Sequence, residues 1–90
     1  MKTFTLFVNN EIVENKSVQN ICESILELNL RKGDVFKLLP FNYDNDEKTN
    51  YKEEFLEWHG TMEIRSIEPR MIITWNNEVK TNISIHLRKI

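Results

Sequence analysis

The side chains best suited to chemistry in this chain are a single cysteine, Cys22, and two histidines, His59 and His86. A catalytic nucleophile needs a base within hydrogen-bonding distance and usually a third group that orients the base. Neither histidine lies in a recognisable catalytic motif, and Cys22 lies on an apolar helical stripe, where burial makes a thiol unreactive. Two glycines are too few for a phosphate-cradling loop. The sequence therefore predicts a protein that is not an enzyme and has no cofactor.

One segment has part of the spacing of a calcium-binding loop. The residues at positions 1, 3, 5, 9 and 12 of that pattern are Asn42, Asp44, Asp46, Asn50 and Glu53. Position 6, where the sharp turn of such a loop needs glycine, is Glu47. A zinc site needs four ligands at recognised spacings, and one cysteine with two distant histidines do not supply them. We therefore expect a solvated acidic loop and no metal site.

Residues 41–58 combine aromatic side chains with negative charge, because they hold six acidic and two basic residues. Aromatic anchors supply much of the energy of protein interfaces, and opposite charge speeds encounter. The segment is therefore expected to bind a basic protein partner, unless its aromatic rings simply cover one end of the fold. The candidate partner-binding residues are Tyr43, Tyr51, Glu53, Glu54, Phe55, Glu57, Trp58 and His59.

The predicted function is that of a non-enzymatic binding protein that acts by occupying a protein partner, as an adapter or an inhibitor from a phage or mobile element would. The alternative is a small nucleic-acid-associated β-barrel that uses its aromatic residues and two basic clusters, Arg31-Lys32 and Arg88-Lys89, to bind RNA or DNA. The net charge of −2 favours the first function, since neutralising phosphates usually requires a basic excess.

The positioning of these residues depends most on a predicted C-terminal hairpin. The alternating branched or aliphatic residues of its last strand, all expected in a helix-backed core, are Val79, Thr81, Ile83, Ile85 and Leu87. The opposite, polar face is expected to lie in water or at a sheet edge, and comprises Lys80, Asn82, Ser84, His86 and Arg88. The preceding strand carries Met71, Ile73 and Trp75, and Asn76-Asn77 predicts a two-residue turn.

A second hairpin and a helix are predicted before residue 34. Residues 3–8 alternate, Asn9-Asn10 forms the turn, and residues 11–14 return. Ser17 is expected to cap a helix over residues 18–31, and Gly33 to end it with a left-handed conformation. The apolar stripe of this helix comprises Val18, Ile21, Cys22, Ile25 and Leu28.

Between the helix and the C-terminal hairpin, the pattern predicts a β-meander with an irregular insert. Residues 35–39 form a short strand that ends at Pro40. Residues 50–58 are compatible with a helical turn inside the insert, 41–58. A strand over residues 61–67 follows, with either a bulge or the end of the strand at Ser66-Ile67, and residues 68–70 are expected to turn the chain.

The order of these signals from Lys32 onward resembles the small bent β-barrels of the Src-homology-3-like, Tudor-like and KOW-type group. The resemblance, over residues 32–88, rests on Gly33-Asp34 before Val35, on Gly60-Thr61-Met62, and on the aliphatic run that ends in Trp75-Asn76. It does not cover the N-terminal hairpin and helix, and Met62 stands where the family prefers valine. The resemblance implies a binding module with an aromatic-lined surface and no chemistry.

Length and composition place these elements in one domain, residues 1–90, with hairpin and helix in 1–33 and the meander in 34–90. The predicted fold class is α+β, mainly antiparallel β, either open or closed into a small bent barrel. No stretch has the roughly 18–20 apolar residues of a membrane helix, and the N-terminus does not resemble a signal peptide. The expected location is cytoplasmic, and the Asn, Lys and Ile content is typical of an AT-rich bacterial or phage genome.

Overall fold

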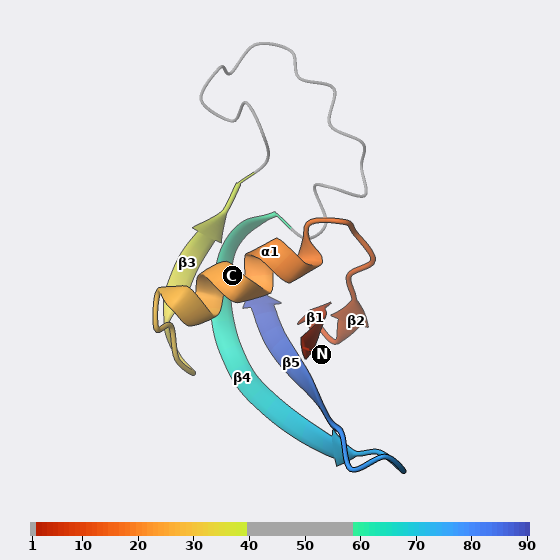
Figure 1. The fold of residues 1–90 in the computed structure, drawn as a ribbon. Helices are drawn as coiled ribbons and strands as arrows, with labels where there is room; N and C mark the ends of the chain where they lie inside the picture. The colour runs from red at the N-terminus through yellow and green to blue at the C-terminus, as the bar shows by residue number, and fades with distance from the viewer. Residues whose placement is uncertain (1, 40–58) are drawn as a thin grey trace.

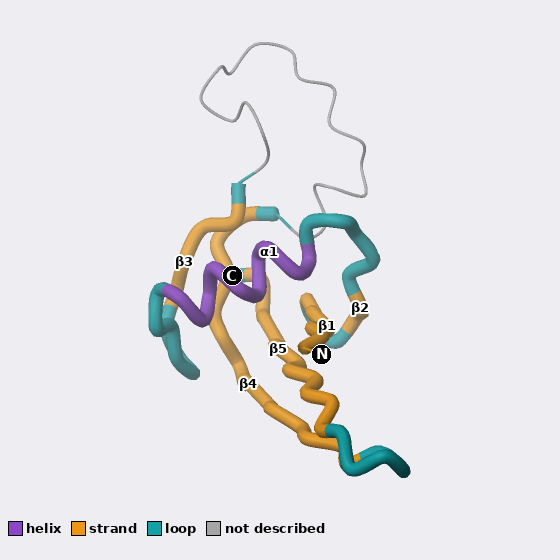
Figure 2. The backbone as a smooth tube through the Cα atoms, viewed as in Figure 1, coloured by secondary structure: helices purple, strands orange, loops and turns teal. Residues whose placement is uncertain are grey.

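The structure is a computed structural model that describes residues 2–39 and 59–90, and these residues form one five-stranded sheet with a single helix on one face (Figures 1 and 2). The elements in chain order are β1 (Lys2–Val8), β2 (Glu11–Ile12), α1 (Val18–Glu27), β3 (Val35–Leu38), β4 (Gly60–Ile73) and β5 (Val79–Lys89). The predicted α+β class, with a mostly antiparallel sheet, is confirmed.

The strand order is β2-β1-β5-β4-β3, with β1 parallel to β5 and the other neighbours antiparallel. Because β2 and β3 lie at opposite edges, the described strands form an open sheet and not the closed barrel considered above. The polar side of β5 was considered as a possible edge, but β5 is the central strand, with β1 on one side and β4 on the other. The resemblance to small barrels stays a prediction.

The core lies between α1 and the middle of the sheet. Its fully or nearly buried residues are Leu6, Val8, Cys22, Ile25, Met62, Ile64, Ile83, Ile85 and Leu87. Three of the five residues predicted for this core from β5 are in it, whereas Val79 is half exposed and Thr81 is partly exposed. The alternation along β5 therefore gives the correct face of the strand but overestimates how much of that face is covered.

Helix α1 ends four residues earlier than predicted, because Asn29 and not Gly33 provides the left-handed stop. Asn29 has φ +57°, and its N–H donates to the Leu26 carbonyl at 3.0 Å. The next N–H, that of Leu30, donates to the Ile25 carbonyl at 3.2 Å, which completes the usual double-bonded helix terminus. Gly33, with φ +93°, instead lies in the turn that leads to β3.

The start of α1 also differs from the prediction. The Ser17 side chain makes no capping bond to the helix. Its hydroxyl and its backbone N–H both donate to Oδ1 of Asn15, at 2.6 and 2.9 Å. Asn15 therefore fixes the entry to the helix through a local side-chain turn, which competes with helix capping for the same serine.

Cys22 is fully buried among the apolar residues of the core, as predicted. Burial, with a smaller contribution from the Glu23 carboxylate, raises the pKa of its thiol to about 11. We therefore expect native protein to resist iodoacetamide at pH 8, because the reactive thiolate is scarce and shielded. Protein unfolded in urea should react fully, as measured by mass spectrometry. Rapid labelling of folded protein would contradict the burial of this thiol.

Strand β4 continues through residues 68–70, where a turn was predicted. The N–H of Thr74 donates to the Glu78 carbonyl at 2.9 Å, and bonding in an antiparallel ladder alternates. Even-numbered residues of β4 after the bulge thus bond to β5, while odd-numbered ones, including Pro69, direct their backbone groups to the outer edge. Pro69 is tolerated because its missing N–H faces away from β5, as is usual for proline at a sheet edge.

Of the two alternatives predicted at Ser66-Ile67, the structure has the bulge, shifted slightly toward the N-terminus, and β4 does not end there. Ile64 pairs with Leu87 and Ser66 pairs with His86, so Arg65 is the extra residue. The bulge changes the alternation, so that Ile67 rather than Ser66 follows Ile64 on the core side.

No helix within residues 2–39 or 59–90 is sufficiently long and apolar to cross a membrane.

Candidate protein-interaction surface

The hairpin of β4 and β5 extends beyond the helix, and its free end, residues 71–79, is called the distal hairpin below (Figures 1 and 2). The ten residues of α1 measure about 15 Å in length, while the eleven residues of β5 measure about 36 Å. Within the described residues, the pairing of the parallel strand β1 along β5 extends to Lys2 and Thr81. The distal hairpin is thus a two-stranded extension of the sheet.

Large apolar side chains cover this extension and face solvent. Their exposed fractions are 75% for Met71, 52% for Ile72, 72% for Ile73, 102% for Trp75 and 51% for Val79. Single exposed apolar residues are ordinary on protein surfaces, but a continuous group is typical of a binding site. The distal hairpin is therefore the candidate interaction surface of the described residues.

The apolar residues of the distal hairpin lie mainly on one side. Ile73 pairs directly with Val79, and both are in phase with Ile83 and Ile85 on the face that α1 covers further along the sheet. Met71 lies on this same side, opposite Thr81, while Ile72 lies on the other side, opposite Lys80. The core face of the sheet thus continues past the end of the helix into water.

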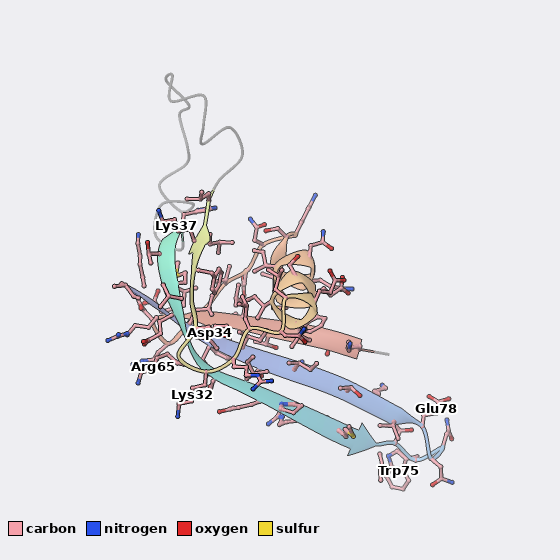
Figure 3. The ribbon with its side chains drawn as sticks, turned by 90° about the vertical axis from the view of Figure 1, so that its left-hand side faces the viewer. Lys32, Asp34, Lys37, Arg65, Trp75 and Glu78 are labelled. Carbon is pink, nitrogen blue, oxygen red and sulfur yellow. The ribbon has the colours of Figure 1, made fainter. Side chains whose placement is uncertain are left out.

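The turn holds Trp75 at the tip in a defined position. It is a three-residue loop of Trp75, Asn76 and Asn77, not the predicted two-residue turn. The N–H of Asn77 donates to the Thr74 carbonyl at 3.0 Å, and Asn77 has φ +61°, a combination common in three-residue hairpin loops. Oγ1 of Thr74 also accepts from the Glu78 N–H at 3.3 Å. Figure 3 shows Trp75 at the end of the hairpin, far from α1.

The N-terminal turn does have the predicted two-residue form. Asn9 and Asn10 have φ +52° and +69°, which is the left-handed pair that a tight hairpin requires. The two Asn-Asn sequences therefore form different turns, although the residues around them are alike.

Seven of the eight predicted partner-binding residues lie outside the described residues, and so do the calcium-like pattern and the possible helical turn at 50–58. The predicted acidic and aromatic surface therefore stays a prediction. The eighth, His59, immediately precedes β4 and is only 9% exposed. Burial, and secondarily the charge of Lys89, lowers the pKa of His59, so its imidazole is neutral at pH 7.

Among the residues that the structure describes, no three of the types His, Cys, Asp and Glu are grouped as metal ligands would be. The polar side of the sheet instead has a network of uncharged side chains. Nδ2 of Asn82 donates to Oγ1 of Thr3 at 2.9 Å, and the Ser84 hydroxyl donates to Oδ1 of Asn82 at 3.3 Å. This network joins β5 to β1 on the side of the sheet away from the core.

Val79 of the distal hairpin, which the alternation of β5 predicts to be in the core, is half exposed, and the length of the helix explains why. Even the predicted helix of 14 residues would measure only about 21 Å, which is too short to cover a strand of about 36 Å.

Comparison of the chain with protein-family models, with curated proteins and with solved structures finds no match. The case for function therefore depends on the surface itself.

Proposed function

We propose that this protein is a non-enzymatic binding protein that occupies a protein partner, in the manner of an adapter or inhibitor, with the distal hairpin as its contact surface. The observation that carries the proposal is the complete exposure of Trp75 on a hydrogen-bonded turn, at the tip of the hairpin that also exposes Met71 and Ile73. Water is a poor environment for such a group, whereas an apolar groove on a partner would remove all three side chains from it.

The residue at the tip of the distal hairpin, a tryptophan, is of a type that is frequent in protein interfaces. Tryptophan is enriched among the residues that contribute most to interface energy, because its large ring buries about 200 Å² of surface. A ring held on a short turn also loses little conformational freedom on binding. The bonds of the loop to Thr74 fix the backbone that carries Trp75, which favours a preformed contact.

The partner chemistry that fits is a protein groove lined by apolar side chains with polar rims of both signs. Arg70 and Lys80, at the base of the distal hairpin, carry positive charge, and Glu78 beside the tip carries negative charge. The basic partner expected for residues 41–58 is compatible with this, because Glu78 would meet a positive rim. The acidic segment would then be a second contact region of the same complex.

A capture experiment from cell lysate tests the proposal. We expect immobilised wild-type protein to retain a partner that the variant Trp75→Ala retains at least 30-fold less, since truncating a central tryptophan costs about 2–4 kcal/mol of binding energy. Mass spectrometry identifies and quantifies the captured protein. Thermal unfolding should be unchanged, because the side chain is fully exposed.

Two control variants locate the contact. Ile12→Ala alters another exposed apolar residue, 59% exposed on β2, and should leave capture unchanged. Tyr51→Ala/Trp58→Ala removes two of the predicted aromatic contacts. Loss of capture in this double variant but not in Trp75→Ala would place the interface at residues 41–58 and overturn the role given to the distal hairpin.

A further inference from the structure

A pocket of about 460 Å³ lies on the polar side of the sheet, at the end opposite the distal hairpin. Three separate segments contribute to it: the turn after β1, the bulge in β4, and the end of β5. Its side chains are those of Asn9, Asn10, Arg65, Ser66, His86 and Arg88. The volume is in the range of pockets that hold small organic ligands. The proposed protein-binding function does not use this site.

Backbone bonds fix one wall of the pocket. The N–H of Asn9 donates to the Leu87 carbonyl, and Oδ1 of Asn9 accepts from the Lys89 N–H, both at 3.0 Å. Because Oδ1 is occupied, the Nδ2 group of Asn9 remains as a donor beside the pocket. The turn is thus attached to β5 at two points and presents an amide donor from a fixed position.

A flat aromatic surface forms part of the floor. The His86 ring stacks on the Phe7 ring of β1, with centroids 4.3 Å apart and the planes within 2° of parallel. On its other side His86 pairs with Ser66, whose small side chain leaves space above the sheet. A planar ring can therefore stack at this side of His86, as aromatic groups of ligands do on protein rings.

The bulge adds positive charge at the edge of the pocket. Arg65 is the unpaired residue of β4, lies on the side of the sheet away from α1 (Figure 3), and makes no ion pair with the other described residues. Arg88 pairs with Glu63 at 3.1 Å and is half exposed, so its remaining N–H groups can donate elsewhere. The Glu68 carboxylate lies 3.9 Å from Nε2 of His86 and would repel an anionic group placed at that side of the pocket.

Guanidinium and amide donors beside a stacking surface are the groups that recognise a phosphate attached to a planar base. We propose that this pocket binds a nucleotide, with its base stacked on His86 and its phosphate held by Arg65, Arg88 and the Asn9 amide. The same chemistry is present in a free mononucleotide and in one nucleotide of a single strand.

Calorimetric titration of the full chain with AMP at 20 mM salt tests the proposal. We expect measurable binding that Arg65→Gln and Arg88→Gln each weaken about 10- to 100-fold, as loss of a charge-assisted phosphate contact does. The matched control is Lys80→Gln, on the same strand and polar side as Arg88 but about 27 Å from it along β5, which should leave affinity unchanged. Trp75→Ala should also bind AMP normally, so that this site and the proposed protein contact are tested separately.

Three results would overturn the proposal. They are no binding of AMP at low salt, equal weakening by Lys80→Gln and Arg65→Gln, and inorganic phosphate binding as tightly as AMP, which would remove the role of the stacked base. An eight-nucleotide oligoadenylate identifies the source of the ligand. Tighter binding than AMP with a steep salt dependence supports a single strand, whereas equal affinity supports a free nucleotide.

Discussion

Replacing Ile85 by alanine is expected to lower the free energy of unfolding by about 2–5 kcal/mol, a large part of the 5–15 kcal/mol that stabilises a typical domain. Ile85 has no solvent exposure and lies at the centre of the sheet, with Leu6 of β1 on one side and Ile67 of β4 on the other. The substitution removes three carbons and leaves a cavity between the sheet and α1. Urea unfolding followed by circular dichroism measures the change.

Val79 provides a matched control for this substitution. It occupies the same face of the same strand, but it lies in the distal hairpin and is half exposed. Val79→Ala should change the free energy of unfolding by about 0.5 kcal/mol or less. If the two alanine variants were equally stable, the core would not be centred on Ile85, and the division of β5 into a covered and an uncovered part would be wrong.

Local patterns in the sequence predict which face of each strand is buried but not which strands are neighbours. The alternation of residues 79–87 correctly places Ile83, Ile85 and Leu87 on one face. It contains no information on the parallel pairing of β1 with β5, in which Phe4 lies beside Ile83. That pairing joins the two ends of the chain, and its stabilising contacts form between residues that are nearly the whole sequence apart.

The turn predicted at residues 68–70 is wrong, because proline occurs both in turns and in the edge positions of strands. Glu68, Pro69 and Arg70 have turn-forming character, yet Pro69 fits inside β4 because its nitrogen faces the outer edge of the sheet. The direction of a backbone N–H depends on the neighbouring strand, so the sequence alone does not show whether a proline ends a strand or only protects its edge. Helix termination is a similar case, since Asn29 adopts the left-handed conformation that was assigned to Gly33.

The candidate sites were harder to predict than the fold, for reasons that differ between them. The distal hairpin is exposed because α1 is shorter than β5, and an apolar residue such as Met71 has the same sequence pattern whether a helix covers it or not. The pocket proposed to bind a nucleotide depends on the bulge at Arg65, which brings this side chain next to residues from the opposite ends of the chain. The register between the strands is needed to show that these pocket residues lie together.

The second large effect is expected for Gly60→Ala, at the first residue of β4. Gly60 has φ +121°, a conformation that residues with a side chain rarely adopt, and an added Cβ would lie 3.2 Å from Cε of Lys89. We expect the substitution to cost about 1–3 kcal/mol of unfolding free energy, mainly from the backbone, because the end of a lysine side chain can move aside. The same urea unfolding experiment measures it.

Two further variants separate the backbone strain from the contact with Lys89. Gly33→Ala introduces a Cβ at φ +93° with no atom within 4 Å, so its cost reports backbone strain alone. In the double variant Gly60→Ala/Lys89→Ala the steric contact is absent, and most of the cost of Gly60→Ala should persist. Full recovery in that double variant would show that crowding by Lys89, and not the backbone angle, makes glycine necessary where the chain enters β4 after the buried His59.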